Sequence, residues 1–307
     1  MDGYFVSGVG VGVGQADIMQ AVREAALLAD VTISVWSGER ADQNMIDDIR
    51  RQAGAQGNVG RFTKNLLAGV DGRLREVKSA FNSVRATHYA LTLPWVSDPH
   101  STRQTGPRLL PHALFQRYLC QMSKQRTAAL DLLDVFLSEY PGLVTQARAN
   151  LAGLAAANYP NTDEVRAAFK VKFDFEPIPA GQQFKGLPDL AIERLAKGLQ
   201  AKQERMLAGA NQAMWGEVKS RVSHIVERLA EPDTRFKVST IESLRELITV
   251  LPAWDMTGDE RVAEVVTEIK GMLDGVKADD IRKDPGVRSD VATRAKQVAD
   301  RLSSWGV

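Results

Sequence analysis

The longest continuous pattern of apolar positions in the chain covers residues 188–231. Its apolar side chains recur every three or four residues, which places them on one face of an α-helix. They are Leu195, Leu199, Met206, Ala210, Met214, Val218, Val222, Ile225 and Leu229. A helix of roughly forty residues would be about 60 Å long, more than a compact domain needs. The pattern predicts one very long helix, packed either in the core of this chain or as a coiled coil against another chain.

Three shorter helices are predicted after the long one. Ser239 followed by Glu242, and Thr257 followed by Glu260, have the spacing of a capping box, which begins a helix. The last apolar repeat covers residues 287–305. We expect these three helices to cover the apolar face of the long helix.

The part of the chain before the long helix combines helical patterns with three predicted strands, near residues 31–36, 89–95 and 169–176. In the third strand, charged residues alternate with large apolar side chains, namely Phe169, Val171, Phe173 and Phe175. The predicted fold class is therefore mainly α: a helical bundle with one very long helix and a small antiparallel β-sheet in the N-terminal half (α+β).

Residues 16–28 and 109–137 carry helical patterns. The second helix is expected to stop near Pro141, because a proline inside a helix removes a backbone hydrogen bond. Asn161, with Glu164 three residues later, marks the start of another helix.

Composition divides the chain into three predicted segments. Residues 1–30 form a Val/Gly-rich arm and a short helix, residues 31–187 an α+β domain with the small sheet, and residues 188–307 the long helix plus the C-terminal helices. The arm lacks the third glycine of a dinucleotide-binding fingerprint. We instead expect an arm or edge strand able to pair with another subunit.

The net charge of +1 hides an uneven distribution, since residues 61–126 contain eleven Lys and Arg against three Asp and Glu. Aromatic residues are interleaved with these cations, as in surfaces that bind phosphates and stack on bases. Contact with an acidic protein, including residues 1–60 of the same or a neighbouring chain, and the absence of any role are the alternatives. The candidate residues are Arg61, Lys64, Arg73, Arg75, Lys78, Arg85, Arg103 and Arg108.

Motifs for catalysis or metal binding are not found. The four histidines lack HExxH or HxxxH spacing, no GxSxG occurs, and the single cysteine, Cys120, is predicted to be a buried helical thiol. We therefore predict no catalytic residue, no metal ligand and no cofactor, and rank an enzyme third among the function classes.

Features of the chain favour a cytoplasmic location. One cysteine excludes an intrachain disulfide, which fits a reducing compartment. The first residues lack the basic stretch of a secretory signal, and no run of about eighteen apolar residues is long enough to span a membrane.

Several short stretches together resemble a family of uncharacterised phage and mobile-element proteins over roughly residues 31–190. They are Thr92-Leu-Pro-Trp95, Gly106-Pro-Arg-Leu-Leu-Pro111, Tyr140, Asn158-Tyr-Pro160, and Phe169 through Pro177-Ile-Pro179. Members of that family are often encoded beside a MoxR-type AAA+ ATPase and a von Willebrand A-domain protein. The resemblance implies a helical companion or adaptor, in the cytoplasm of a bacterial host cell if the chain is phage-encoded. It assigns no binding residue.

The predicted function is that of a non-catalytic, phage-type intracellular protein that acts through protein–protein contacts, by self-assembly or as the companion of an AAA+ ATPase system. We expect a homo-oligomer, with an AAA+ ATPase or a von Willebrand A-domain protein as possible partners. Self-association is assigned to Met206, Met214, Val218 and Val222 of the long helix, with the Val/Gly arm as another route. The alternative is a nucleic-acid-binding protein that uses residues 61–126.

Overall fold

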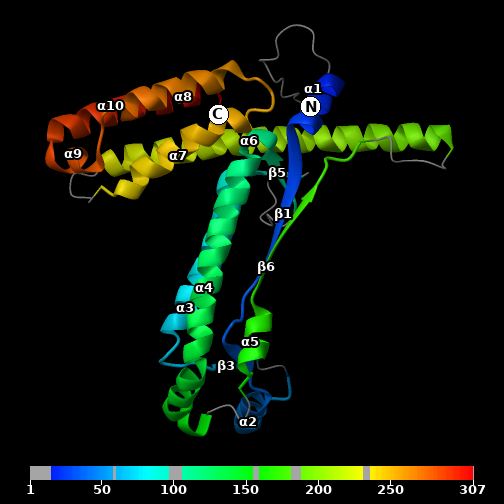
Figure 1. Ribbon diagram of the computed structural model, residues 1–307, viewed down its shortest axis with the longest axis vertical. Helices are drawn as coiled ribbons and strands as arrows, with labels where there is room; N and C mark the ends of the chain where they lie inside the picture. The colour runs from blue at the N-terminus through cyan, green and yellow to red at the C-terminus, as the bar shows by residue number, and fades with distance from the viewer. Residues whose placement is uncertain are drawn as a thin grey trace. The chain divides into compact units, whose positions relative to one another are not determined.

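The computed structural model describes residues 15–57, 60–96, 106–154, 159–180, 188–230 and 236–306 (Figure 1). Within these ranges the chain is 72% helical, with ten α-helices and a small antiparallel sheet of four strands. The predicted fold class is confirmed. Residues 1–14 of the predicted Val/Gly arm and the 97–105 loop, which holds Arg103, lie outside the described residues.

The chain divides into two compact units, each assembled from separate stretches of sequence. The long-helix unit comprises Met1–Asp30, Leu91–Arg117 and Asp174–Val307, and the two-helix unit comprises Val31–Ala90 and Tyr118–Phe173. In each unit, packing joins stretches that are distant in sequence, so neither unit is a contiguous segment of the chain.

The long-helix unit contains most of the helices. They are α1 (Gln15–Ala25), α6 (Asp189–Ala230), α7 (Val238–Trp254), α8 (Glu260–Leu273), α9 (Ala278–Lys283) and α10 (Pro285–Ser304). The sheet has the strand order β4-β5-β1-β6, formed by β4 (Leu93–Pro94), β5 (Arg108–Pro111), β1 (Ala26–Ser34) and β6 (Lys170–Glu176). The last two strands, and α4 (His112–Leu151), have residues in both units.

Helix α6 is the predicted long helix, 42 residues in length. From Gln203 onward its apolar face is buried, and helices α7 and α10 pack against it while α8 packs on α7 and α10 (Figure 1). Each Val, Leu or Met fully buried in this way stabilises the fold by about 1.5–3 kcal/mol. The expectation that the C-terminal helices cover the long helix is confirmed for this part of it.

The two predicted capping boxes are not formed. Helix α7 begins after Lys237 with no side-chain cap, and α8 begins after Asp259, whose side chain caps it, so both predicted boxes were misplaced. Carbonyl groups at helix C-termini accept from guanidinium groups, which also favour the negative end of the helix dipole. Arg288 donates to the carbonyls of Arg228 and Leu229, at 3.1 and 3.2 Å.

Two segments predicted as helix are strands in the structure. Residues 26–28 belong to β1 and residues 109–111 to β5, which pair antiparallel with Ala26 opposite Pro111 and Ala29 opposite Arg108. Short apolar runs do not distinguish a buried strand from a buried helix, so pairing decided the outcome. Conversely, residues 89–91, predicted as strand, end a helix. The third predicted strand is confirmed as β6.

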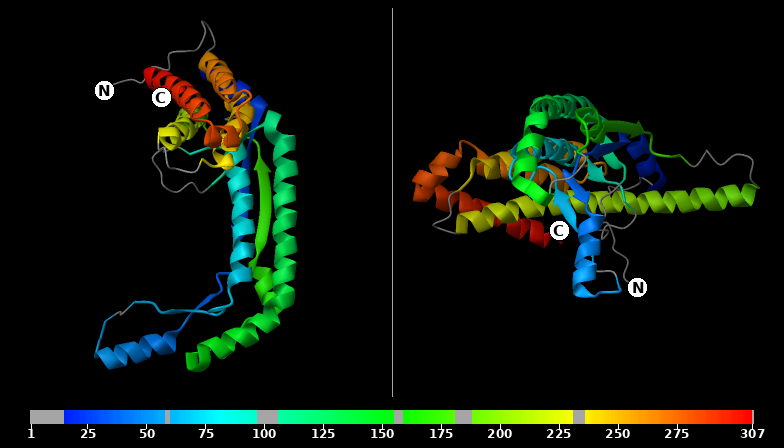
Figure 2. Two further views of the ribbon diagram at one scale, coloured as in Figure 1. Left: turned by 90° about the vertical axis from the view of Figure 1, so that its left-hand side faces the viewer. Right: turned by 90° about the horizontal axis from the view of Figure 1, so that it is seen from below.

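The two-helix unit is built on α3 (Gly72–Leu91) and α4, which run antiparallel side by side (Figure 2). Arg73 bonds to Glu139 at one end of the pair, and His88 lies 2.8 Å from the Tyr118 hydroxyl at the other. The remaining elements are β2 (Glu39–Ala41), α2 (Gln43–Ala53), β3 (Thr63–Asn65), a 3-10 turn (Ala152–Leu154) and α5 (Thr162–Ala168). The capping box of Asn161 and Glu164 at the start of α5 is confirmed.

Helix α4 continues through Pro141, where the sequence predicted a break. Tyr140 and Ala147 are buried on either side of the proline, and the Tyr140 hydroxyl donates to the carbonyl of Pro160 at 2.9 Å. The Tyr140 ring also packs against Trp36 and Phe136. These tertiary contacts outweigh the cost of about 3 kcal/mol that a proline imposes on a helix interior.

Candidate interaction surface

Half of the basic candidates are engaged within the two-helix unit. Lys64 forms an ion pair with Asp42 and lowers the pKa of that carboxyl group. Lys78 donates to the carbonyl of Ser37. Arg73 and Arg75 pair with acidic neighbours of the same unit, namely Glu76, Glu139 and Asp71. The hydrogen bond that Arg73 donates to Glu76, together with the charge of Glu139, raises the pKa of Arg73.

The contact between Lys64 and Asp42 matches one of the expected alternatives, in which basic residues dock on acidic residues 1–60 of the same chain. Lys64 and Asp42 are both half-buried, and one ion pair of this kind does not by itself hold the unit together. It does neutralise part of the positive charge that the alternative function requires.

Arg108 needs a correction as a surface candidate. Its side chain is buried, with 6% exposure, and its guanidinium group donates to the hydroxyl and the carbonyl of Thr92 at 2.7 and 2.9 Å. It fastens the end of β5 and is not available to a phosphate at the surface. Arg61 and Arg85 are exposed.

The residues assigned to self-association also need a correction. Met214, Val218 and Val222 have no exposed surface, because the C-terminal helices of the same unit cover them. Met206 is half-buried. The buried side chains belong to the core of the long-helix unit, which is the other reading that the apolar pattern left open. A contact with a second chain through them would require this core to open.

The first part of α6 differs from the rest of the helix. Its first buried residue is Gln203, so residues 189–202, here called the exposed half, contain no buried side chain. Leu190 is 81% exposed and Leu195 44% exposed. In Figure 1 this half extends past α7 and α10, the helices that pack against residues of 203–230, here called the buried half.

Gln203 marks where the packing of the chain on this helix begins. Its side chain is 2% exposed, donates to the carbonyl of Pro179 at 2.8 Å and accepts from Arg23 of α1 at 2.7 Å. A buried amide held from two sides fixes the position of α6 because its polar groups must stay paired. The helix N-terminal to this point is anchored at one end, and its apolar residues are exposed, as Leu195 is, or half-buried, as Ile192 and Leu199 are.

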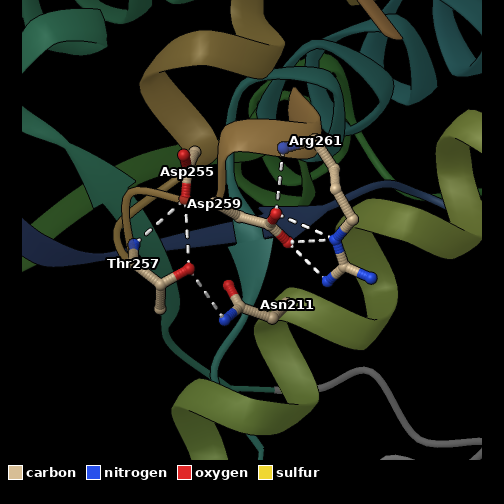
Figure 3. Close-up of polar contacts among 5 residues, drawn as sticks. All are labelled: Asn211, Asp255, Thr257, Asp259 and Arg261. Carbon is tan, nitrogen blue, oxygen red and sulfur yellow. Dashed lines mark hydrogen bonds and ion pairs between the residues drawn. The ribbon is translucent and has the colours of Figure 1, made fainter. Parts of the chain in front are cut away.

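A polar cluster joins the loop between α7 and α8 to the buried half of α6 (Figure 3). Asp255 accepts from the backbone N–H and the hydroxyl of Thr257, both at 3.1 Å, and Asn211 lies 3.5 Å from that hydroxyl. Asp259 accepts from the backbone N–H of Arg261 at 3.1 Å and from its guanidinium group at 2.6 Å. Each carboxylate is thus bound by donors of the residue two positions further along the chain.

Arg261 extends this cluster to two tryptophans. Its guanidinium carbon lies 5.5 Å from the ring centre of Trp215 in α6 and 6.0 Å from that of Trp305 near the C-terminus. Burial raises the pKa of Asp259, but the hydrogen bonds from Arg261 outweigh it and the net shift is downward, while Asp259 raises the pKa of Arg261. The arrangement is a clamp that fixes α6, α8 and the chain end together.

The histidines and the cysteine were the remaining candidates for chemistry. His88 is buried against Tyr118, whereas His112 and His224 are exposed. Cys120 is exposed, so its prediction as a buried thiol was wrong, because it lies on the solvent side of α4. Among the described residues, no three His, Cys, Asp or Glu side chains are grouped closely enough to hold a metal ion.

None of the helices in the described ranges carries an apolar stretch long enough to cross a membrane. Comparisons with protein-family models, with curated proteins and with solved structures each returned no match for this chain. The exposed half of α6 is therefore proposed as a surface on its own geometry. The sequence contained its periodic residues, Leu195 and Leu199, but not the information that none of the described elements buries their half of the helix.

Proposed function

We propose that this chain is a non-catalytic protein that acts through protein–protein contacts, and that the exposed half of α6 is its interaction surface. The observation that carries the proposal is the 44% exposure of Leu195 in a helix whose apolar face is buried only from Gln203 onward. Exposed apolar side chains that continue a buried stripe are typical of surfaces that associate with another protein.

The resemblance to phage and mobile-element proteins supports the same class of function. A role beside an AAA+ ATPase or a von Willebrand A-domain protein stays a prediction, as does the cytoplasm of a bacterial host as the place of action. Such a partner would contact the chain through a docked helix, since a single exposed helical face is what the surface offers.

The nucleic-acid alternative is the less favoured function. Of its candidate residues, Arg108 is buried, and Lys64, Arg73 and Arg75 are already paired with carboxylates. A protein that binds nucleic acid gains affinity by neutralising phosphates with cations that are otherwise solvated.

Light scattering on a size-exclusion column tests the proposal, with and without short single- and double-stranded DNA, at about 50 and 200 mM salt. We expect a discrete assembly whose mass is the same with and without DNA. A mass that rises only when DNA is added, and falls back at the higher salt, would overturn the proposal in favour of the basic residues.

A further inference from the structure

The exposed half of α6 carries one apolar face with the spacing of a coiled-coil seam. Ile192, Leu195 and Leu199 are separated by three and four residues, the repeat that keeps side chains toward a partner helix. The opposite face carries Arg194, Lys197 and Ala201, all exposed. The segment is therefore amphipathic even though the chain leaves no residue of it buried.

Small residues flank this face and allow a second helix to come close. Ala191 and Ala196 lie beside the larger side chains, and a Cβ added to Gly198 would meet no atom within 4 Å. A helix that approaches another helix closely gains van der Waals contact along its whole length. The shape of the face fits a helix better than a strand or a loop.

The distribution of charge indicates which helix fits. The exposed half begins with Asp189 and Glu193 and ends at Lys202, with Arg205 just beyond it, and all four are exposed. Glu193 also pairs with Lys197 at 2.7 Å, and Glu204 lies between the two basic residues, so the basic end keeps an excess of one positive charge. A parallel pair of these segments would bring like charges together, whereas an antiparallel pair places the acidic end of each beside the basic end of the other. Opposed helix dipoles favour the same orientation.

We propose that the partner is a second copy of this chain, bound antiparallel through the exposed halves of the two α6 helices. This inference rests on the proposed function and names its partner. In the register that pairs the leucines, Leu195 of each copy lies opposite Leu199 of the other, and Ile192 lies beside the aliphatic stem of Lys202. Such a two-fold contact uses the same surface on both copies and closes into a dimer.

The mass of the protein in solution tests the dimer. At about 100 μM, where a Kd of about 10 μM leaves most chains paired, we expect twice the chain mass of 33.7 kDa. Leu195→Glu places a charge in the apolar face and should return the mass to that of one chain. Ala201→Glu adds the same charge on the opposite face and should leave the dimer intact.

Unfolding does not complicate this comparison. No buried residue lies in the segment that carries Leu195 and Ala201, so both variants should retain the wild-type circular dichroism spectrum. A variant that lost helical signal beyond this segment would show that the segment supports the core, which would contradict the exposed-half description.

Cysteine cross-linking in a Cys120→Ser background tests the orientation. In the antiparallel dimer, residue 192 of one copy lies beside residue 202 of the other, while the two copies of residue 192 are about 15 Å apart. Mixed Ile192→Cys and Lys202→Cys chains should therefore form a disulfide-linked dimer that neither variant forms alone. A disulfide between two Ile192→Cys chains would overturn the antiparallel arrangement.

The outcomes separate this inference from the proposed function. A DNA-independent dimer that Leu195→Glu leaves unchanged overturns the α6 contact, while protein association itself stands. A chain that stays monomeric at about 100 μM without DNA overturns the dimer. A monomer whose mass rises with DNA overturns the proposed function as well.

Discussion

The two halves of helix α6 have the same helical period but opposite surroundings. In residues 203–230 the apolar face is covered by other helices of the unit, and Met214, Val218 and Val222 have no exposed surface. In residues 189–202 the face continues without any buried residue, and Leu195 is 44% exposed. An amphipathic pattern therefore identifies the face of a helix that will be buried, but not what covers it or where the cover ends.

The largest difference in stability between the two halves is expected when a charged side chain is placed in each. Val222→Asp buries an unpaired carboxylate in the core and should lower the free energy of unfolding by about 4 kcal/mol or more. Leu195→Asp, in the exposed half, should change it by less than about 1 kcal/mol. Urea unfolding followed by tryptophan fluorescence reports mainly on the long-helix unit, which contains Trp95, Trp215, Trp254 and Trp305, whereas the fifth tryptophan, Trp36, lies in the two-helix unit.

The unfolding of Val222→Asp and Leu195→Asp is measured at low protein concentration, so that association does not contribute to the stability of the wild type. Equal destabilisation by the two aspartates would show that the exposed half is part of the folded core.

Truncation of a methionine to alanine should cost more stability in the middle of the buried half than near its N-terminal end. Met214→Ala should cost about 2–5 kcal/mol, because it leaves a cavity among fully buried neighbours. Met206, two turns nearer the exposed half, is only half-buried and its alanine variant should cost clearly less. The midpoints of the same urea transitions give both values, and equal losses would move the edge of the core toward the N-terminus.

The contact of Asp259 with Arg261, which joins α8 to α6, should make a pH-dependent contribution to stability, and only in the buried half. Asp259→Ala removes the cap of α8 and the partner of Arg261, and should cost about 1–2 kcal/mol near neutral pH. Since the folded-state pKa of Asp259 is lowered, this stability is fully present above the ordinary carboxyl pKa and disappears as the pH falls through the folded-state pKa.

Unfolding of the wild type and of Asp259→Ala, compared between about pH 3 and pH 7, measures this effect. Asp189→Ala, in the exposed half, serves as the matched control, and its stability should differ from that of the wild type by the same small amount at every pH. A cost that stays constant over this range would assign the effect of Asp259 to something other than its charge.

The smallest expected effect is the gain in helix stability when either of two glycines of α6 is replaced by alanine. A Cβ added to Gly198 or to Gly216 would meet nothing within 4 Å, so alanine at either position should favour the helix by about 0.5–1 kcal/mol. The gain should appear in the global free energy of unfolding for Gly216→Ala, since the buried half unfolds with the core. For Gly198→Ala it should appear only as slower amide hydrogen exchange in residues 189–202.

A global gain of equal size for both glycine variants would show that the two halves unfold as one cooperative element. In that case residues 189–202 would be stabilised by contacts with the core, which would contradict the absence of buried residues in this segment.

Local patterns of the sequence predicted a good part of the fold. The spacing of apolar residues in α6 required a long helix, the alternation from Phe169 to Phe175 required a strand, and Asn161 with Glu164 required a helix start. In each case the information lies within a few residues of the chain, because it depends on side-chain period or on a hydrogen bond to a neighbouring N–H.

Tertiary structure decided the rest. It allowed α4 to continue through Pro141, because Tyr140 and Ala147 are held by packing. It turned the run from Ala26 into a strand, because β5 was there to pair with it. It also placed Val222 in a core and left Leu195 at the surface, although both belong to one stripe. A side-chain period is a local property, whereas burial depends on which distant segments come to lie against it.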